Sequence, residues 1–123
     1  MKIVKFIAAA LFGLFLVYGG VNHFIKPTFY DPFIPDFLPK LAVNYATGIV
    51  EILIGVGLFI PAFRHKAAFA ALLLMLAFTP IHLWDLWSAT PAIGSRNAAW
   101  IRIAVQGLFI AWMYWLNRPE KTK

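Results

Sequence analysis

The chain has 123 residues, of which 62% are hydrophobic, 17% aromatic and only 13% charged. A soluble domain of this size could not cover so much apolar surface, so the composition predicts one membrane-embedded domain. The net charge of +6 comes without a basic stripe or a nucleic-acid-binding motif, so we expect no nucleic-acid partner, and the lack of cysteine excludes disulfides, thiolate metal sites and thiol relays within these residues.

Four apolar segments follow one another along the chain, at residues 3–23, 41–63, 67–84 and 98–116. Each is long enough to cross the hydrocarbon core of a bilayer, about 30 Å thick, which takes roughly 20 helical residues. Only helices and closed barrels satisfy the backbone in lipid, and no segment here alternates in polarity as barrel strands do. We therefore predict an all-α membrane protein, an antiparallel four-transmembrane-helix bundle that forms a single domain over residues 1–123. The first segment follows two lysines as a signal peptide does, but no small-residue cleavage site comes after it, so we expect it to remain as the first span.

Lysine and arginine are distributed unequally between the two ends of the predicted bundle. One end collects the basic residues Lys2, Lys5, Arg64, Lys66, Arg118, Lys121 and Lys123. The other end has Lys26, Lys40, Arg96 and Arg102, together with Asp31, Asp36 and Asp85. Because cytoplasmic loops carry the excess of basic residues, we expect both termini in the cytoplasm, with the basic C-terminal tail against anionic membrane lipid.

Glu51 lies about 15 Å deep in the second predicted span, at a rise of 1.5 Å per residue. An unpaired carboxylate at that depth is costly, so the side chain is expected to be protonated, paired or exposed to a cavity. The residues that share its helical face are Asn44, Gly48 and Gly55. That face is polar and small, so it should point into the bundle. Two interpretations stay open: Glu51 acts in a functional site, or its carboxyl group hydrogen-bonds a neighbouring helix and fixes the packing.

Further polar residues fall in the same outer half of the predicted membrane. With the expected topology these are His23, Asn44, His82, Asp85, Arg102 and Gln106. Since the inner half has almost no polar residue, we expect a polar cavity that opens toward the outer face or sideways toward the outer leaflet. The candidate ligand-binding residues are Glu51, His23, His82, Arg102, Gln106, Asn44 and, from the segment after the first span, Tyr30.

Several of these polar residues also have a structural explanation. A histidine near the interface can simply face water, Arg102 can extend toward the headgroups instead of pairing with Glu51, and Gln106 can hydrogen-bond a neighbouring helix. Asp85 can be an ordinary loop residue at the membrane edge. The histidines do not form a spaced metal motif, so we expect no metal site, and we assign no catalytic residue.

The segment between the first two spans, residues 24–40, is rich in proline and aromatic residues. Pro27, Pro32, Pro35 and Pro39 rule out a continuous helix. Its phenylalanines and Tyr30 make it too apolar for a free loop, so the segment is expected to lie along the outer interface. It either forms a semi-rigid aromatic lid over the cavity or anchors the chain passively in the headgroup region.

Four motifs occur in order along most of the chain. They are G-x-x-H-F at the end of the first span, P-x-x-Y-x-x-x-x-P in the segment that follows, G-x-x-E-I-x-x-G-x-G-L in the second span, and a proline late in the third. The residues that carry them are Gly20, His23, Phe24, Pro27, Tyr30, Pro35, Gly48, Glu51, Ile52, Gly55, Gly57, Leu58 and Pro80. Over residues 13–85 this pattern resembles the DoxX-like family of small four-helix integral membrane proteins.

The resemblance implies a role in membrane redox chemistry. Founding members of the family are described as the membrane subunit of a thiosulfate:quinone oxidoreductase, and others as partners of redox or oxidative-stress enzymes. We therefore expect a subunit in the bacterial inner (plasma) membrane that has no intrinsic cofactor but binds a quinone or a similar lipophilic ligand, and that acts with a redox partner protein rather than as an enzyme alone. Assembly as a homo-oligomer is also open to it. The alternatives are a non-catalytic assembly or ligand-binding protein and, less favoured because the inner half lacks a polar path, a small transporter.

Overall fold

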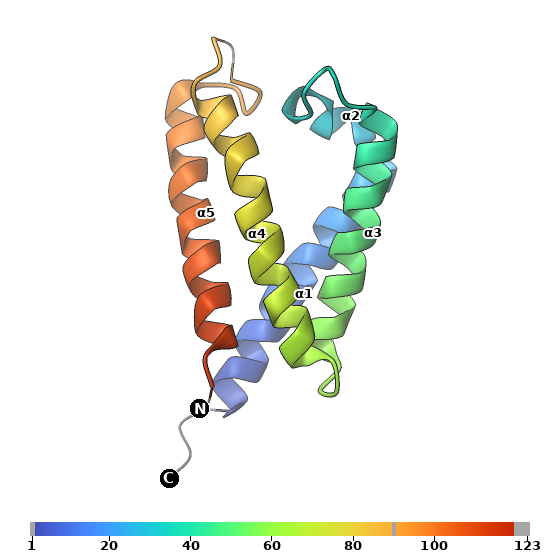
Figure 1. The fold of residues 1–123 in the computed structure, drawn as a ribbon, viewed down its shortest axis with the longest axis vertical. Helices are drawn as coiled ribbons and strands as arrows, with labels where there is room; N and C mark the ends of the chain where they lie inside the picture. Colours follow the sequence, from blue (N-terminus) through green and yellow to red (C-terminus); the bar gives the residue numbers. More distant parts are fainter. Residues whose placement is uncertain (1, 90, 120–123) are drawn as a thin grey trace.

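Four long helices make up most of the structure (Figure 1). The computed structural model describes residues 2–89 and 91–119, and within them it contains helices and no strand. The long helices are α1 (Lys2–Ile25), α3 (Lys40–Phe59), α4 (Arg64–Leu86) and α5 (Arg96–Asn117), and the short α2 (Pro27–Tyr30) and 3-10 helix η1 (Asp31–Phe33) lie between α1 and α3. Each long helix is, by length and composition, able to cross a membrane. The prediction of an all-α, four-helix integral membrane protein is therefore confirmed.

The turn between α3 and α4 follows from its local sequence. α3 ends at Phe59 rather than near residue 63, because Ile60 takes the extended conformation that residues before a proline prefer, and Pro61 has no N–H to donate to the helix. Arg64 closes the turn, since its Nε and Nη2 donate to the carbonyl oxygens of Leu58 and Phe59 at 2.8 and 3.2 Å. This arginine therefore satisfies the last carbonyl groups of α3.

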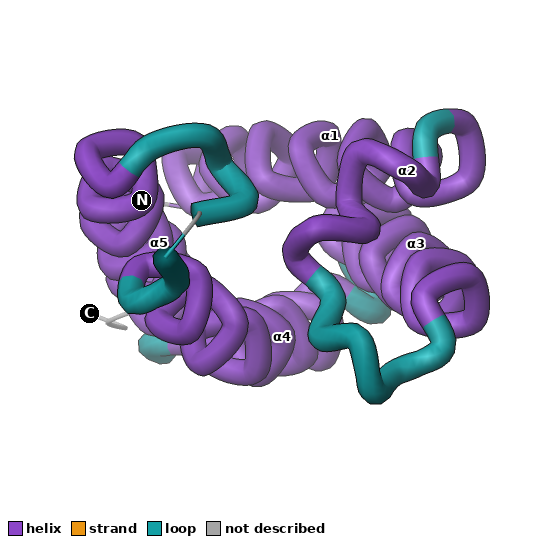
Figure 2. The backbone as a smooth tube through the Cα atoms, turned by 90° about the horizontal axis from the view of Figure 1, so that it is seen from above, coloured by secondary structure: helices purple, strands orange, loops and turns teal. Residues whose placement is uncertain are grey.

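Prolines also shape the segment from residue 26 to residue 39, which we call the lid segment. Pro27 occupies the first turn of α2 and Pro32 the first turn of η1, where a missing N–H costs no helical hydrogen bond. Two very short helices form instead of one long helix, as the prolines predicted. The lid segment lies across one end of the bundle, as Figure 2 shows from above.

The helices α1 and α3 pack backbone to backbone through pairs of glycines. A Cβ on Gly13 would lie 2.8 Å from the carbonyl oxygen of Gly55, and a Cβ on Gly20 would lie 2.7 Å from that of Gly48. Real side chains do not tolerate such short contacts with backbone, so only glycine permits this approach. The close contact fixes α1 and α3 as one rigid pair.

The bundle is packed at one end and hollow at the other. At the terminal end, which holds the α3–α4 turn and the two chain ends, Phe12 of α1 packs edge-on against Trp112 of α5 with ring centroids 5.1 Å apart. Lys5 Nζ donates to the carbonyl oxygen of Arg118 at the same end, at 2.5 Å. Toward the lid end, which holds the lid segment and the α4–α5 loop, α1 leans away from α5 and toward α3 (Figure 1). The two helices are therefore in contact mainly at the terminal end.

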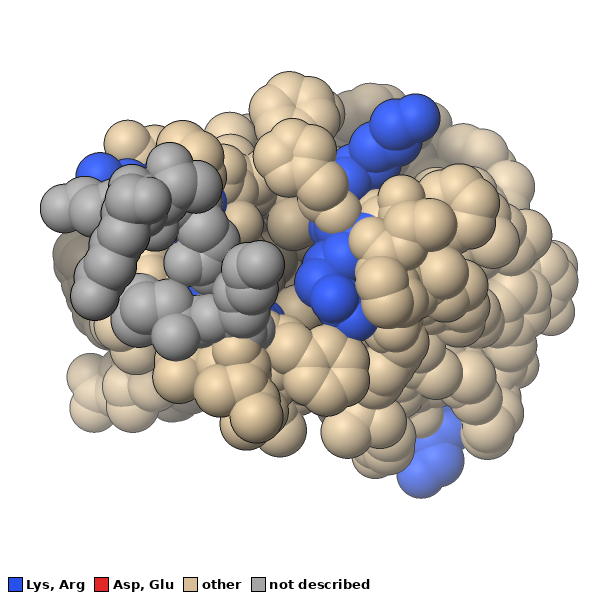
Figure 3. All heavy atoms as spheres, turned by 90° about the horizontal axis from the view of Figure 1, so that it is seen from below, with Lys and Arg blue, Asp and Glu red and all other residues tan. Residues whose placement is uncertain are grey.

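The terminal end is basic. Lys5, Arg64, Lys66 and Arg118 lie at this end, in the first turns of α1 and α4 and just after α5. Figure 3 views this end from below and shows basic side chains, with no acidic side chain of the described residues visible. These basic residues, which the sequence assigned to one end of the bundle, thus lie together at the terminal end.

Candidate ligand-binding cavity

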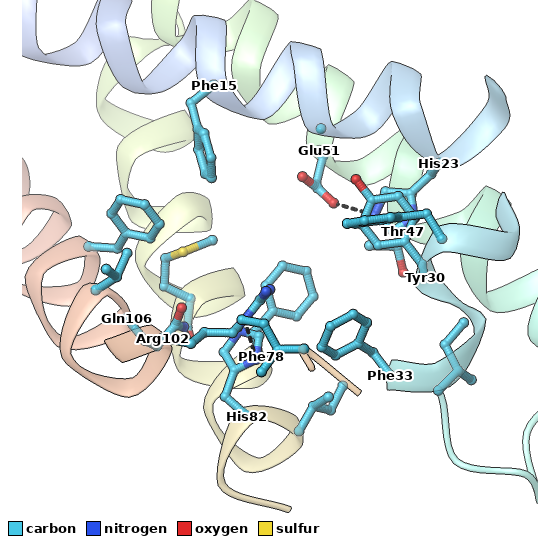
Figure 4. A pocket seen from close by; sticks show the side chains of 18 of the residues that line it. Phe15, His23, Tyr30, Phe33, Thr47, Glu51, Phe78, His82, Arg102 and Gln106 are labelled. Atoms are coloured by element: carbon cyan, nitrogen blue, oxygen red, sulfur yellow. Dashed lines mark hydrogen bonds and ion pairs between the residues drawn. The ribbon is translucent and has the colours of Figure 1, made fainter. Parts of the chain in front are cut away.

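A cavity of about 570 Å³ lies at the lid end, between the α1–α3 pair and the α4–α5 pair. Small-molecule sites typically have volumes of roughly 300–1,000 Å³. Most of the wall is apolar, with Phe15, Phe78 and Phe109 among the lining side chains, and Phe33 of the lid segment points into the cavity (Figure 4). All seven residues predicted from the sequence line it: His23, Tyr30, Asn44, Glu51, His82, Arg102 and Gln106. The expected cavity is therefore present and carries the predicted polar residues, but most of its wall is apolar, and ligand binding by these residues stays a prediction.

A first polar group joins α1 to α3 on one wall of the cavity. His23 of α1 lies between two side chains of α3, with its Nδ1 2.9 Å from Asn44 Oδ1 and its Nε2 2.9 Å from Glu51 Oε2 (Figure 4). All three side chains are buried. Of the possibilities open to a carboxyl group at this depth, Glu51 is thus paired with a histidine as well as facing the cavity.

The orientation of Asn44 determines which nitrogen of His23 carries hydrogen. Asn44 Nδ2 donates to Asp31 Oδ1 at 3.0 Å and to the backbone carbonyl oxygen of Pro27 at 3.3 Å, and a backbone carbonyl oxygen can only accept. Asn44 Oδ1 therefore faces His23 and accepts, so His23 Nδ1 must donate. One further proton then lies between His23 Nε2 and Glu51 Oε2, bound to one of the two atoms. The His23–Glu51 pair is consequently able to give or take a proton at the cavity wall.

Tyr30 of the lid segment covers the His23 ring. The two ring centroids are 3.8 Å apart and the ring planes differ by 21°, and the Tyr30 hydroxyl accepts a hydrogen bond from Asn22 Nδ2 at 3.1 Å. Sequence reasoning missed Asn22 and Asp31 as members of this polar group. The sequence signal for Asn22 was its position next to His23 at the end of the first span. Asp31 had been considered only as one of the charged residues at that end of the predicted bundle.

A second polar group lies on the opposite wall and joins α4 to α5. Arg102 Nε donates to His82 Nδ1 at 3.0 Å, so this histidine nitrogen is an acceptor and carries no hydrogen. The Arg102 guanidinium carbon also lies 5.0 Å from the ring centroid of Phe33, within the range of a cation–π contact. Arg102 is therefore not the partner of Glu51. Among the residues that the structure describes, its Nη groups have no hydrogen-bond partner, so their N–H donors are available at the cavity.

Gln106 and Asp85 have partners that explain them structurally. Gln106 Nε2 donates to the carbonyl oxygen of Met75 at 2.5 Å and so links α5 to α4. The buried carboxylate of Asp85 accepts from the backbone N–H groups of Ala92 and Ile93 at 2.5 and 3.4 Å, which fixes the α4–α5 loop. Within residues 2–89 and 91–119, no three or more His, Cys, Asp or Glu side chains gather as metal ligands do.

The fold and the cavity define a class of protein, namely a four-helix membrane protein whose cavity carries polar groups on facing walls. The family model described as "Domain of unknown function (DUF8561)" matches residues 11–117, and the chain belongs to this family. The matched range includes the lid segment and every residue of the two polar groups. No curated protein and no solved structure matches the chain.

Proposed function

We propose that this chain binds a quinone, or a similar lipophilic ligand with carbonyl oxygens, as the membrane subunit of a redox or oxidative-stress complex. The observation that carries the proposal is that two hydrogen-bonding groups, His23–Glu51 and Arg102–His82, lie on opposite walls of a mostly apolar cavity (Figure 4). A flat apolar ring with oxygen atoms on opposite edges is chemically matched to such a cavity. The sequence resemblance to DoxX-like proteins supports the same interpretation.

In this proposal the two walls have different tasks. Arg102 donates hydrogen bonds from its Nη groups to one ligand oxygen, while the His23–Glu51 pair holds a proton at Nε2 or Oε2 for another. Tyr30 and Phe33 of the lid segment cover the ring and keep water away. A bound quinone supplies redox chemistry that couples electrons to protons, and a partner protein exchanges the electrons.

The same proposal places the chain in a bacterial inner membrane with both termini in the cytoplasm. The basic side chains gathered at the terminal end support this orientation, because cytoplasmic segments carry the excess of lysine and arginine (Figure 3). The cavity then belongs to the outer half of the bilayer.

The test is to purify the protein in mild detergent and identify the co-extracted small molecules by mass spectrometry. We expect a quinone with the wild type, its loss with Glu51→Gln and with Arg102→Gln, and its retention with Leu53→Ala, a lipid-facing change on the same helix as Glu51. Glu51→Gln keeps the size of the side chain and removes the acid that shares a proton with His23. Phospholipid alone in all four samples would contradict the proposal.

A second function, a non-catalytic assembly or ligand-binding protein, is favoured by one observation. Both ring nitrogens of His23 and both polar atoms of Asn44 have protein partners, as expected of a network that stabilises the fold. Under this alternative, deleting the chain lowers the abundance of a partner protein without changing quinone reduction in isolated membranes. Restoration of the partner by the Glu51→Gln variant would favour this alternative over the first proposal.

A further inference from the structure

The side chains that line the cavity differ in exposure from helix to helix. On α3 and α4 they are buried or half-buried, as Val43 and Ile81 are. On α1 and α5 the lining includes exposed side chains, with Tyr18 74% and Ile101 64% exposed. A side chain that both lines a cavity and lies on the outer surface marks an opening. The cavity therefore opens sideways between α1 and α5.

This opening, which we call the α1–α5 portal, is bordered by Phe15, Tyr18, Ile101 and Val105. Tyr18 lies about 10 Å below the lid end of α1, at 1.5 Å per residue, and therefore at the depth of the hydrocarbon chains. The portal ends toward the terminal end, where the rings of Phe15 and Phe109 are in contact at a centroid distance of 5.0 Å. An opening at this depth faces lipid rather than water.

The lid segment is tied to the α1–α3 pair and lies over the aqueous side of the cavity, where Phe29 both lines the cavity and is 61% exposed. Lys40 Nζ donates to the carbonyl oxygens of Asp31 and Ile34 at 2.9 and 2.8 Å, and Asn44 and Asn22 hold the same segment from α3 and α1. A ligand from water would have to pass beside this tethered segment, whereas a ligand already in the membrane meets the portal directly.

We infer that the cavity takes its ligand from the lipid bilayer through the α1–α5 portal, and that the ligand is a long-chain amphiphile whose head group enters while its hydrocarbon chain stays in the portal. The inference rests on the proposed function and names the ligand class more closely. A cavity of about 570 Å³ has room for a ring-bearing head group but not for a long chain as well, so the chain must leave it. The apolar border of the portal suits that chain, and the Nη groups of Arg102, which have no hydrogen-bond partner among the described residues, suit an oxygen of the head group.

The experiment compares two probes in lipid nanodiscs, a benzoquinone bearing a decyl chain and the same benzoquinone without the chain. Val105→Trp narrows the portal, and Leu108→Trp on the same helix is the matched control, since Leu108 is 68% exposed and does not line the cavity. With Val105→Trp we expect binding of the decyl probe to weaken about tenfold or more, the effect of losing roughly two buried methylene groups, while the chainless probe and the control variant are unaffected. Unchanged binding of the decyl probe, or equal loss of both probes, would overturn the inference.

A second measurement does not depend on quinone binding. A phospholipid with a photoreactive diazirine in its head group is incorporated into the nanodisc, and its adducts are mapped by mass spectrometry. We expect adducts on Phe78 and Ile81, which line the cavity wall away from the portal, and their loss with Val105→Trp. Adducts confined to lipid-facing residues such as Leu73 would overturn the portal. If neither benzoquinone binds the wild type but the inner adducts form, the proposed function fails and the portal stands.

Discussion

At the scale of single residues, Asn44 organises the first polar group. It accepts from His23 and donates to Asp31 and Pro27, and it is completely buried. Asn44→Leu keeps the branching at Cγ but replaces both polar atoms with bulkier methyl groups, which leaves the His23 Nδ1–H and the Asp31 carboxylate without this partner, so we expect it to lower the free energy of unfolding by about 1–3 kcal/mol. Thermal unfolding in detergent, followed by tryptophan fluorescence, measures the difference. Thr47→Val is the control, because Thr47 lines the same cavity and its side chain makes no hydrogen bond to any residue that the structure describes. Equal stability of the two variants would contradict the role of Asn44.

The tautomer of His23 gives a second prediction at this scale. Nitrogen NMR of the histidine-labelled protein should show a protonated Nδ1 on His23, because Asn44 Oδ1 can only accept. In Asn44→Leu this constraint is gone, and we expect the ring to prefer the hydrogen on Nε2, where it faces Glu51. His65→Gln and His82→Gln variants identify the signals of the other two histidines. An unprotonated Nδ1 on His23 in the wild type would show that the amide of Asn44 is oriented the other way.

The sequence predicted the setting of Glu51 better than its partner. Helical periodicity alone put Glu51 on one face with Asn44, Gly48 and Gly55, and all four are buried in α3. The predicted depth in the membrane allowed either His23 or Arg102 to be the partner of Glu51, because both lie in the same half of the bilayer as Glu51. Which of them meets Glu51 depends on which helix lies beside α3, and that is decided by side-chain packing between helices far apart in sequence.

At the scale of the helices, the glycine contacts between α1 and α3 hold the first wall of the cavity in place. A Cβ on Gly55 would lie 2.8 Å from the carbonyl oxygen of Gly13, so Gly55→Leu must push the two helices apart. We expect it to destabilise the protein by about 1–3 kcal/mol or more, as overpacking does, and to weaken ligand retention because His23 and Glu51 come from different helices. Gly107→Leu is the matched control, since a Cβ on Gly107 meets no atom within 4 Å. Thermal unfolding in detergent gives the result, and equal loss in both variants would contradict the role of the close contact.

Helix ends show where local chemistry was sufficient for prediction and where it was not. Pro27 and Pro32 predicted that the lid segment would not form one continuous helix, and the structure has two very short helices there. Pro61 carried the signal for the end of α3 at Phe59, but hydropathy alone extended the span to residue 63 because the turn residues Ile60 and Phe63 are apolar. At such a turn the proline and the hydropathy predict different ends for the helix, and the helix ends where the proline predicts.

At the scale of the whole molecule, the hollow end and the basic end lie at opposite ends of the bundle. Phe12, Leu16 and Met113 fill the space near the terminal end, whereas both polar groups and the cavity lie toward the lid. The cavity therefore belongs to one leaflet of the membrane. Which leaflet it is depends on the orientation of the chain, so orientation decides where a ligand comes from.

Orientation can be measured directly because the native chain has no cysteine. Phe37→Cys places a thiol in the lid segment, at a position that is 84% exposed, and Lys66→Cys places one at the basic terminal end. If basic residues face the cytoplasm, a membrane-impermeant thiol reagent added to intact bacterial cells should modify Phe37→Cys at once and Lys66→Cys only after lysis. The opposite pattern would place the cavity in the inner leaflet. The α1–α5 portal would then draw its ligand from the cytoplasmic side of the bilayer, and a partner protein that exchanges electrons with the cavity would have to be sought there.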